Sequence, residues 1–457
     1  MSSFTVSGSR VVVVGAARSG MAAAELLLRR GARVTLSDMK SSLPDEARLR
    51  GGGIALELGT NDPAAAADAD LLVTSPGVPP ELPVLAHARA RGTPVMGELE
   101  LAFRWLRGRV IAITGTKGKS TTTTLVGRML QSAGRRVLVG GNIGVPVSAQ
   151  VDDSTADTVH VIETSSFQLE ATATFRPWIA ALLNFSPDHL DRHPSEREYA
   201  DAKRRIFANQ TADDWAVVNA DNDPALALAA EVRARRLHYS LRAAADADVF
   251  VDRDFVWQRT SEGASPLIPL AAIRLSGRHM LSNVAAAAAV SHAAGVTGEA
   301  MARALEGFTG LEHVMEPSGE IGGVRFVNDS KATNVDAAAR SIESFDRVVA
   351  IIGGRYKGGN FGDLAGPLSS RGKGVVAIGE SRPLVRHALS DVVPLVEADS
   401  MADAVTKAYD MAVPDGVVLL APACSSFDMF KDYIDRGEQF RRAAMELAQR
   451  SEAKRQG

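Results

Sequence analysis

The stretch Val110-Ile-Ala-Ile-Thr-Gly-Thr-Lys-Gly-Lys-Ser-Thr-Thr-Thr-Thr124 decides the fold of the middle of this chain. An apolar run rich in β-branched residues ends at Gly115, and a helical pattern follows Ser120. A strand, a glycine loop and a helix in this order aim backbone N–H groups and the positive end of the helix dipole at a phosphate. Lys119 adds a mobile charge for the outer phosphates, and Ser120 adds a hydroxyl that can reach Mg²⁺. The stretch therefore predicts a phosphate-binding loop.

The loop differs from the most common phosphate-loop spacing. In G-x-x-x-x-G-K-[ST] the first glycine would fall at Ile113, whereas this chain has Gly115 and a shorter loop. A glycine-rich turn with a chance Lys-Ser pair is the alternative interpretation. We favour the phosphate loop because strand, glycines, lysine, hydroxyl and helix all agree.

Length and composition limit the class of protein. The chain has 457 residues, enough for about three domains at ~150 residues each. Its residues are 46% hydrophobic and 23% charged, as in globular domains with apolar cores, and its net charge of −3 favours neither nucleic acid nor anionic membranes. The single cysteine, Cys424, excludes an internal disulfide framework, and no signal-peptide pattern is visible. We expect a cytoplasmic protein with no membrane insertion and no nucleic-acid partner.

The N-terminal segment has the pattern of a Rossmann-like βαβ unit. A buried strand over residues 10–14 leads into a turn at Gly15, a helix, and a second strand that ends at Asp38. Ala17 occupies the position of the second glycine of the fingerprint G-x-G-x-x-G, which disfavours NAD. Another nucleotide or phosphate ligand and a purely structural turn remain as interpretations. A further strand ends in Ser75-Pro-Gly77, at the sheet edge where such folds bind ligands.

Strands of the middle segment also end in polar residues. One leads into Gly140-Gly-Asn-Ile-Gly144, a second ends at Glu163, and a third leads into Asp188-His-Leu-Asp-Arg-His193. A carboxylate at the tip of a buried strand, near a phosphate loop, is well placed to hold Mg²⁺ directly or through water, although an ordinary strand-end acid is the alternative. His189 follows a strand in the same domain as Glu163, which favours a metal ligand over a structural histidine. By spacing alone, Lys203 lies on a solvated helix face.

The remaining segments complete a pattern of open sheets. Short strands over residues 243–269 predict a peripheral sheet. From about Gly310, strands alternate with helices, and the strands end in polar clusters at residues 328–334 and 353–359. This alternation predicts a third open α/β sheet with polar groups at the carboxyl ends of its strands. Three α/β domains with such sites suit an enzyme that gathers ATP and two other substrates at domain junctions.

Taken together, five strings resemble the Mur ligases of peptidoglycan synthesis, and the resemblance extends from Gly15 to about Arg436. The strings are Gly115-Thr-Lys-Gly-Lys-Ser-Thr121, Gly140-Gly-Asn-Ile-Gly144, Glu163-Thr-Ser-Ser-Phe-Gln168, Asp188-His-Leu-Asp-Arg-His193 and Asn328-Asp-Ser-Lys-Ala-Thr-Asn334. Within the family, the last string and Pro422-Ala-Cys-Ser-Ser-Phe-Asp428 point to the branch that adds D-glutamate.

The resemblance implies a three-domain α/β fold. It comprises an N-terminal Rossmann-like domain for the UDP-sugar over residues 1–97, a central P-loop ATP-binding domain over 98–310, and a C-terminal Rossmann-like α/β domain for the amino acid over 311–457. Ligases of this design need the last domain to swing onto the central one, with motion at linkers near Gly97 and Gly310.

The resemblance also implies a reaction in cytoplasmic peptidoglycan precursor synthesis, and hence in cell wall biogenesis, cell shape and cell division. The carboxylate of UDP-N-acetylmuramoyl-L-alanine attacks the γ-phosphate of ATP to form an acyl phosphate. The amine of D-glutamate then displaces the phosphate through a tetrahedral intermediate, giving an amide, ADP and phosphate. The implied cofactors are ATP, Mg²⁺ and a carbamylated Lys203, and the implied oligomeric state is a monomer.

Each implied site residue occupies a position that matches a family motif. The catalytic residues are Lys119, His189 and Lys203. The residues near ATP are Gly115, Lys117, Gly118, Lys119, Ser120, Thr121, Asn283 and Asp329. The metal ligands are Ser120, Glu163, His189 and Lys203. The substrate-binding residues are Arg18, Ser19, Asp38 and Gly77 for the UDP group, Asn142 for the nucleotide-sugar, and Lys331, Thr333, Lys357, Ser426, Phe427 and Tyr433 for D-glutamate. The resemblance thus assigns Lys203 to the active site, whereas spacing alone predicts a surface lysine.

Two positions depart from the family pattern, and three rival functions remain. Val314 stands where the family has an arginine that touches ATP, and Met280 stands where it has an asparagine. Another Mur or folylpolyglutamate-type ligase should differ at Lys331, Thr333 and Lys357. A Rossmann oxidoreductase is disfavoured because Ala17 interrupts the dinucleotide fingerprint and because the chain has a predicted ATP loop. A non-catalytic nucleotide-binding regulator should lack the metal-site residues that this chain keeps.

Overall fold

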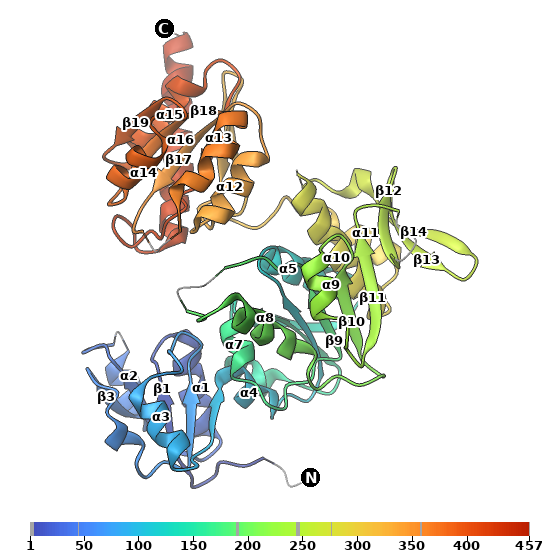
Figure 1. The fold of residues 1–457 in the computed structure, drawn as a ribbon, viewed down its shortest axis with the longest axis vertical. Coiled ribbons are helices and arrows are strands. Elements are labelled where there is room, and N and C mark those ends of the chain that lie inside the picture. Colours follow the sequence, from blue (N-terminus) through green and yellow to red (C-terminus); the bar gives the residue numbers. More distant parts are fainter. Residues whose placement is uncertain are drawn as a thin grey trace. The chain divides into compact units, whose positions relative to one another are not determined.

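The computed structural model describes residues 4–43, 45–188, 192–243, 247–275, 277–356 and 359–456 (Figure 1). The chain forms two compact units, Met1–Phe308 and Thr309–Gly457. The first contains two sheets and the second contains one, which confirms the predicted α/β class. The domain boundaries expected after residues 97 and 310 stay predictions. Within the described ranges, no helix is both long and apolar enough to cross a membrane.

The N-terminal sheet has five parallel strands in the order β3-β2-β1-β4-β5. The valines of β1 are buried, as expected for a parallel strand that is covered on both faces. Gly20, in the first turn of α1, has to be glycine because a Cβ there would lie 1.7 Å from the carbonyl oxygen of Gly15. The elements are β1 (Arg10–Val14), α1 (Arg18–Arg29), β2 (Arg33–Asp38), α2 (Glu46–Gly51), β3 (Ala55–Leu58), η1 (Pro63–Ala66), β4 (Leu71–Thr74), α3 (Pro83–Ala90) and β5 (Val95–Gly97).

The central sheet has nine strands in the order β14-β13-β12-β11-β10-β9-β6-β8-β7. Its first elements carry the phosphate loop, between β6 and α5, and the strand end that was predicted to hold a metal. These elements are α4 (Glu98–Phe103), β6 (Arg109–Thr114), α5 (Lys119–Ser132), β7 (Arg136–Gly141), α6 (Val147–Gln150), η2 (Val151–Asp153), β8 (Thr158–Glu163), α7 (Ser166–Glu170), β9 (Ile179–Leu182), α8 (Glu196–Arg204), η3 (Arg205–Phe207), β10 (Trp215–Asn219) and α9 (Asp223–Leu228).

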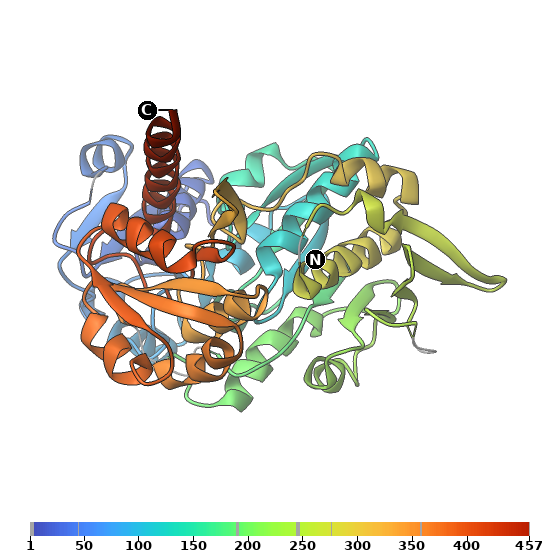
Figure 2. The same cartoon turned by 90° about the horizontal axis from the view of Figure 1, so that it is seen from above.

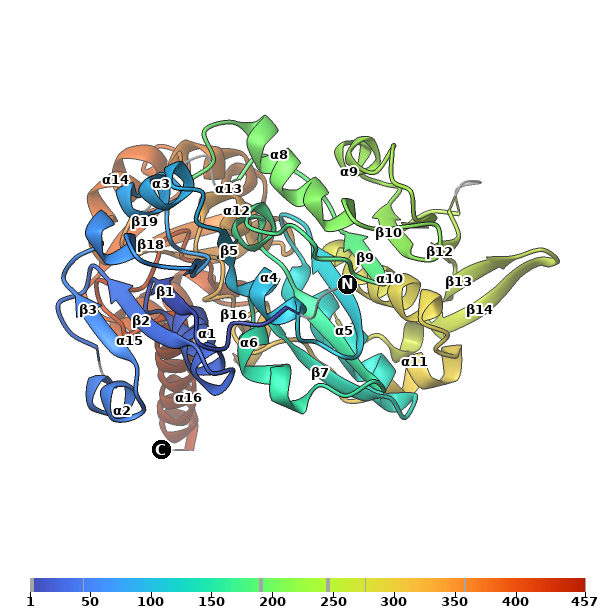
Figure 3. The ribbon, with the colours of Figure 1, turned by 90° about the horizontal axis from the view of Figure 1, so that it is seen from below.

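The strands predicted to form a peripheral sheet lie at one edge of this sheet and extend it. β12 pairs in parallel with β11, and the antiparallel hairpin of β13 and β14 continues the sheet outward, where it projects from the unit (Figure 2). Helices α10 and α5 pack against each other (Figure 3). The elements are β11 (Arg235–Ser240), β12 (Val249–Asp252), β13 (Phe255–Thr260), β14 (Gly263–Pro269), η4 (Leu270–Ala272), α10 (Arg278–Ala293) and α11 (Gly298–Leu305).

The two sheets of the first unit share a buried apolar cluster. Leu26 of α1 lies in the same cluster as Leu99 of α4, Val147 of α6 and Ala112 of β6. Outside this core, Arg29 and Arg30 of the N-terminal part both pair with Asp152 of the central part, at 2.8 and 2.7 Å. Apolar packing therefore joins the N-terminal and central sheets into one compact body.

The second unit contains one six-stranded sheet in the order β15-β16-β20-β17-β18-β19. Its strands are parallel except β15, which pairs antiparallel with β16 at one edge. The elements are β15 (Glu316–Ile321), β16 (Val324–Asn328), α12 (Val335–Glu343), β17 (Val348–Gly353), η5 (Phe361–Leu364), α13 (Ala365–Arg371), β18 (Gly372–Ile378), α14 (Arg382–Leu389), β19 (Leu395–Ala398), α15 (Met401–Ala412), β20 (Val417–Leu420) and α16 (Tyr433–Gln456).

Candidate active site

The phosphate loop lies between β6 and α5 and packs against α10. Gly118 precedes α5 with φ 81°, the left-handed conformation that glycine adopts without strain. A Cβ at this position would lie 2.2 Å from Oδ1 of Asn283. The loop and Asn283, two predicted ATP-binding features far apart in sequence, are therefore in contact. Met280, which departs from the family pattern, accepts a hydrogen bond from Nδ2 of Asn283 through its sulfur at 3.7 Å.

Two lysine side chains meet at the start of this loop. Nζ of Lys119 donates to the carbonyl oxygens of Gly115 and Thr116, at 2.9 and 3.0 Å. Nζ of Lys203, on α8, donates to the same oxygen of Gly115 at 2.8 Å. Lys203 is only 1% exposed, and its Nζ lies 4.7 Å from the ring centre of Tyr199. The solvated helix face expected from spacing alone is therefore wrong for Lys203.

The environment of Lys203 disfavours its charged form. Burial lowers the pKa of Lys203 well below its ordinary value, and the positive charge of Lys119 lowers it further. The carboxylates of Asp188 and Glu163 act in the opposite direction on that pKa, but with smaller effect. Burial and the charge of Lys119 together favour the neutral, nucleophilic form of the amine.

Glu163 ends β8, next to β6, and is 1% exposed. Its Oε1 accepts a hydrogen bond from Nδ2 of Asn142 at 2.6 Å, and its backbone oxygen accepts one from the Asn142 N–H at 2.9 Å. Its buried Oε2 has no hydrogen-bond partner in the described part of the chain. Because a buried carboxylate oxygen is costly without a partner, this oxygen fits a cation such as Mg²⁺.

The other predicted metal ligands are less completely described. Ser120 lies in the first turn of α5, within the predicted loop. His189 lies outside the described residues. Over the ranges that are described, no three His, Cys, Asp or Glu side chains are grouped as a metal site. Glu163 therefore carries the observation that fits a metal, with Ser120 and Lys203 on neighbouring elements.

Two residues that follow β9 contact Lys117 in the loop between β6 and α5. One of them, Asn184, was not predicted from the sequence. Oδ1 of Asn184 accepts from the N–H of Lys117 at 2.9 Å, and Nδ2 of Asn184 donates to the Lys117 carbonyl at 3.1 Å. Nζ of Lys117 pairs with Asp188 at 3.5 Å. A polar residue just past a strand that neighbours β6 was the available signal for Asn184. Thr121, one position further into α5 than Ser120, is buried.

The N-terminal part presents a second site at the point where its strand order reverses. β1 and β4 are neighbours there, and open α/β sheets bind ligands at such switch points. A Cβ at Gly15 would lie 2.7 Å from Val78 and 2.9 Å from Ser75, so the turns after β1 and β4 pack together. Gly77 is exposed in the second turn.

The predicted UDP-binding residues surround these turns. Asp38, at the end of β2, accepts hydrogen bonds from the N–H groups of Ala16 at 2.6 Å and Lys40 at 2.8 Å, so it shapes the first turn. Arg18 is exposed at the start of α1 and donates to the carbonyl oxygen of Gly144 at 3.2 Å. Ser19, beside it, is half-buried. Arg18 thus links the predicted UDP site to the glycine-rich segment that contains Asn142.

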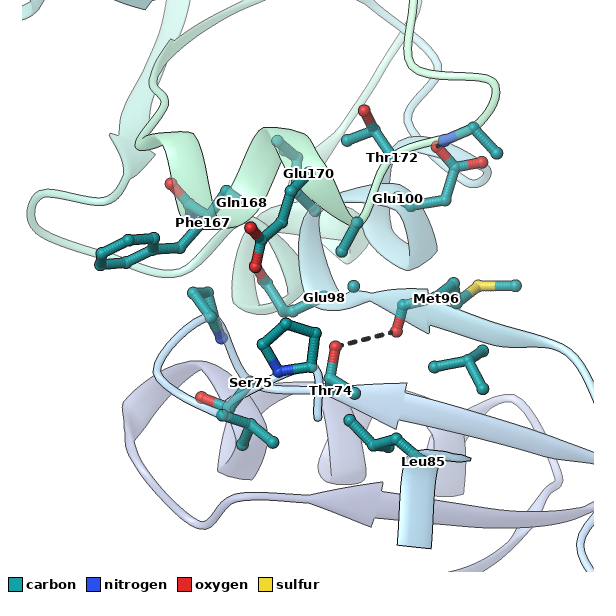
Figure 4. A pocket seen from close by; sticks show the side chains of 18 of the residues that line it. Thr74, Ser75, Leu85, Met96, Glu98, Glu100, Phe167, Gln168, Glu170 and Thr172 are labelled. Atoms are coloured by element: carbon teal, nitrogen blue, oxygen red, sulfur yellow. Dashed lines mark hydrogen bonds between the residues drawn. The ribbon is translucent and has the colours of Figure 1, made fainter. Parts of the chain in front are cut away.

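A cavity of about 540 Å³ lies beside these turns, between the N-terminal sheet and helix α7 of the central part (Figure 4). Its walls come from the turn after β4, from β5 with the start of α4, and from α7. In it, Oγ1 of Thr74 donates to the carbonyl of Met96 at 3.5 Å. Glu98 lines this cavity and is 1% exposed, and burial raises its pKa. No motif in the sequence predicts a cavity at this junction.

In the second unit, the predicted amino-acid-binding residues lie on loops at the carboxyl ends of β16 and β20 and at the start of α16. Lys331 and Thr333 follow β16, Ser426 and Phe427 follow β20, and Tyr433 begins α16. Ser426 is buried, whereas Phe427 is 57% exposed. Lys357 lies outside the described residues.

Arg436, which sequence reasoning did not select as a site residue, joins these loops. It is fully buried and donates from Nε and Nη2 to Ser330, at 2.9 and 2.8 Å, and from Nη1 to the Cys424 carbonyl at 3.1 Å. Burial lowers its pKa to about 10. A buried guanidinium that is satisfied by two loops fixes their spacing.

Asp329, predicted near ATP, is engaged inside the second unit. Its Oδ1 accepts from the N–H of Met315 at 3.2 Å, and its Oδ2 accepts from the hydroxyl of Ser341. His313 is buried, and its Nδ1 lies 3.0 Å from Nδ2 of Asn328, the residue that precedes Asp329. Val314, at a position where the resemblance leads us to expect an arginine, follows His313 directly.

Comparison with known families matches the chain in three parts. Residues 9–97 match the N-terminal domain described as Mur ligase MurD-like, residues 113–291 match the Mur ligase middle domain, and residues 315–424 match the Mur ligase glutamate ligase domain. These matches follow the order of the three sheets.

Solved structures with a similar fold have low sequence identity. A pseudomurein peptide ligase type C from Methanothermus fervidus has a TM-score of 0.60 and 17% identity, covering 96% of this chain and 100% of that one. The UDP-N-acetylmuramate-alanine ligase MurC from Thermotoga maritima has a TM-score of 0.61 and 18% identity, with the same coverage. At such identities the likeness shows the fold alone.

Curated relatives are much more similar in sequence. The UDP-N-acetylmuramoylalanine–D-glutamate ligase of Acidobacterium capsulatum is 46% identical over 440 residues, which cover 95% of each chain. The ligase of the same name from Koribacter versatilis is 44% identical over 452 residues, covering 97% of this chain and 99% of the relative. With three domain matches and near full-length relatives at these identities, the chain belongs to the Mur ligase family, in the branch of UDP-N-acetylmuramoylalanine–D-glutamate ligases.

Proposed function

We propose that the chain adds D-glutamate to UDP-N-acetylmuramoyl-L-alanine at the expense of ATP, in peptidoglycan precursor synthesis. The observation that carries the proposal is its 46% identity, over 95% of both chains, to a relative named for this activity. The phosphate loop, the buried Glu163 and the buried Lys203 supply the groups that such a reaction needs. A Rossmann oxidoreductase has no comparable support.

In this proposal, residues of the first unit position ATP. The loop from Gly115 to Thr121, with Lys117 and Gly118, surrounds the phosphates, and the N–H groups at the start of α5 donate to them. Lys119 leaves its two carbonyl partners to hold the β- and γ-phosphates. Asn283, in contact with the loop, and Asp329 of the second unit lie near the nucleotide.

Ser120 and Glu163 would hold one Mg²⁺, and His189 with a modified Lys203 would hold a second. When bound, Mg²⁺ neutralises charge on the oxygens of the transferring phosphoryl group. Glu163 Oε2 supports this assignment, since it is buried without a hydrogen-bond partner in the described ranges. Asn142 orients the same carboxylate through Oε1 at 2.6 Å, and it is also assigned to the nucleotide-sugar.

Lys203 is proposed to carry a carbamate. A neutral lysine amine attacks CO₂ and releases a proton, which converts the uncharged amine into a carbamate, an oxygen ligand with negative charge. The burial of Nζ and the proximity of Lys119 favour the neutral amine that this step requires.

The substrates occupy the strand-end sites. Arg18, Ser19, Asp38 and Gly77 are assigned to the UDP group, at the switch point of the N-terminal sheet. Lys331, Thr333, Lys357, Ser426, Phe427 and Tyr433 are assigned to D-glutamate, where two lysines can meet two carboxylates. The alanine carboxylate attacks the γ-phosphorus, ADP leaves, and the D-glutamate amine expels phosphate from the acyl carbon.

The remaining expectations concern the protein as a whole. Because all assigned ligands come from one chain, a monomer suffices. We expect it in the cytoplasm, where ATP and nucleotide-linked precursors are available. Catalysis requires the second unit to approach the first during turnover. A small-angle scattering profile that does not change when both substrates and a non-hydrolysable ATP analogue are added would argue against such a movement.

An isotope experiment tests the reaction. Substrate labelled with ¹⁸O in the alanine carboxylate is incubated with ATP, Mg²⁺ and D-glutamate. One ¹⁸O per turnover should appear in inorganic phosphate, because the attacking carboxylate oxygen leaves with the phosphoryl group. Amide formation with unlabelled phosphate would exclude the acyl phosphate, and absence of any amide would exclude the proposed function.

A further inference from the structure

Arg192 connects the two sheets of the first unit at a place that the assigned site residues do not explain. Its Nη2 donates to the carbonyl oxygen of Val78, in the turn after β4, at 3.2 Å. The same nitrogen donates to Oε1 of Glu170, at the end of α7, at 2.6 Å. Its guanidinium lies 5.2 Å from the ring centre of Phe167, also on α7. The Arg192 side chain, in the central part, thus donates a hydrogen bond to a backbone carbonyl of the N-terminal part.

The surroundings make these contacts stronger than those of a surface arginine. The Arg192 side chain is 15% exposed and the Glu170 side chain 25% exposed, so water competes little with the ion pair. Val78, Phe167 and Glu170 all line the cavity of Figure 4. Arg192 therefore links Val78 on one wall of that cavity to Glu170 on another.

Val78 is part of the predicted nucleotide-sugar site. Its N–H donates to the carbonyl of Ser75 at 3.0 Å, which closes the turn that contains Gly77. Its side chain packs over Gly15, where a Cβ would lie 2.7 Å from it. A shift of Val78 would consequently move both turns at the switch point of the N-terminal sheet.

On the other side, α7 follows the metal-site strand closely. Only Thr164 and Ser165 separate Glu163 from α7, and Ser165 caps that helix by accepting from the N–H of Gln168 at 3.2 Å. His193, next to Arg192, contacts Ser166 at 2.9 Å. Arg192 thus ties the nucleotide-sugar turn to the short helix that continues from Glu163.

We infer that Arg192 is a positioning residue that sets the nucleotide-sugar site against the metal and phosphate sites, so that the substrate carboxylate reaches the γ-phosphate. The inference rests on the proposed function. It assigns Arg192 no contact with substrate. Its loss should weaken the binding of the one substrate that spans both sheets, and should leave the ATP and D-glutamate sites intact.

The test compares Arg192→Ala and Arg192→Lys with Arg197→Ala as the matched control. Arg197 lies nearby on α8, but its side chain is 91% exposed, and its Nε pairs with Asp201 of the same helix at 3.9 Å. For each protein, KM is measured for all three substrates, together with the dissociation constant of UDP-N-acetylmuramoyl-L-alanine without ATP. Unfolding temperatures are recorded in parallel.

Arg192→Ala should raise the KM and the dissociation constant for the nucleotide-sugar about tenfold, since a buried hydrogen bond to a charged group is lost. The KM values for ATP and D-glutamate should stay within about twofold, Arg192→Lys should recover part of the loss, and the control should match wild type. Unchanged nucleotide-sugar binding, or an equal rise of all three KM values, would overturn the inference. If Arg192→Ala does not fold, Arg192→Lys and Arg192→Met decide by the same criteria. An inactive wild-type enzyme would count instead against the proposed function.

Discussion

Lys203 and Lys119 donate to one and the same acceptor, the carbonyl oxygen of Gly115, at 2.8 and 2.9 Å. Two ammonium groups so close in a buried place repel each other, and Lys203, at 1% exposure, is the one deprived of water. Burial and the neighbouring charge of Lys119 therefore favour the neutral form of the Lys203 amine.

The first prediction concerns the modification of Lys203. Its depressed pKa keeps the amine neutral at lower pH than an ordinary lysine, and as pH falls through that value the amine is protonated and the carbamate is lost. Wild-type enzyme in ¹³C-bicarbonate should show a carbamate carbon resonance that disappears on acidification together with activity. Lys203→Arg should lack both the resonance and the activity. Full activity in Lys203→Arg would sink the carbamate role.

The second prediction concerns Glu163. Glu163→Gln should lower kcat roughly 100-fold or more, because the buried oxygen that fits Mg²⁺ is lost. The metal-free variant should unfold at the same or a higher temperature than wild type, since the buried carboxylate, whose Oε2 has no hydrogen-bond partner in the described ranges, becomes a neutral amide. Mn²⁺ titration followed by electron paramagnetic resonance measures the metal directly. Unchanged Mn²⁺ affinity in the variant would refute the assignment.

The third prediction separates backbone strain from site geometry. Gly118→Ala and Gly134→Ala each place a side chain at positive φ, 81° and 72°, which costs about 1–2 kcal/mol of stability. Only at Gly118 would the new Cβ meet Asn283, at 2.2 Å, whereas nothing lies within 4 Å at Gly134. Gly118→Ala should therefore raise the KM for ATP, and Gly134→Ala should not. Equal ATP kinetics in both variants would show that the contact between Gly118 and Asn283 does not matter for ATP.

The fourth prediction concerns Glu98 at the cavity. Burial raises its pKa above the ordinary 4.5, so the folded protein binds this proton more tightly than the unfolded chain does. Stability is then lost as pH rises through the interval between these two values. Glu98→Gln keeps an acceptor for the Ser148 N–H, at 2.7 Å in wild type, and removes the charge. The variant should gain unfolding temperature relative to wild type at pH 8, and less at pH 5. A gain that is independent of pH would contradict this explanation.

Local sequence patterns were enough to predict the strand, glycine loop and helix around Gly115 and the polar strand ends, because such elements form from neighbouring residues. Lys203 could not be found in this way. Its burial depends on contact with Gly115, which is 88 residues away in sequence. The spacing of apolar residues on its helix does not encode that contact, and only the family resemblance pointed to it.

Long-range contacts also explain what the sequence missed. Asn184 and Arg436 act through hydrogen bonds to loops 67 and 106 residues away. The pairing of β12 with β11, which attaches the hairpin to the central sheet, involves only two residue pairs, and short strands of this kind give no local sign of their partner. The positions of glycines such as Gly118 were visible, but the side chains that they accommodate were not.

The amino acid accepted by the enzyme tests the central claim most directly. Phosphate release is measured with UDP-N-acetylmuramoyl-L-alanine, ATP and Mg²⁺, offering D-glutamate, L-glutamate, L-lysine, meso-diaminopimelate or D-alanyl-D-alanine in turn. Turnover with D-glutamate, and little with the other four, is the predicted result. Turnover with another amino acid and none with D-glutamate would contradict it.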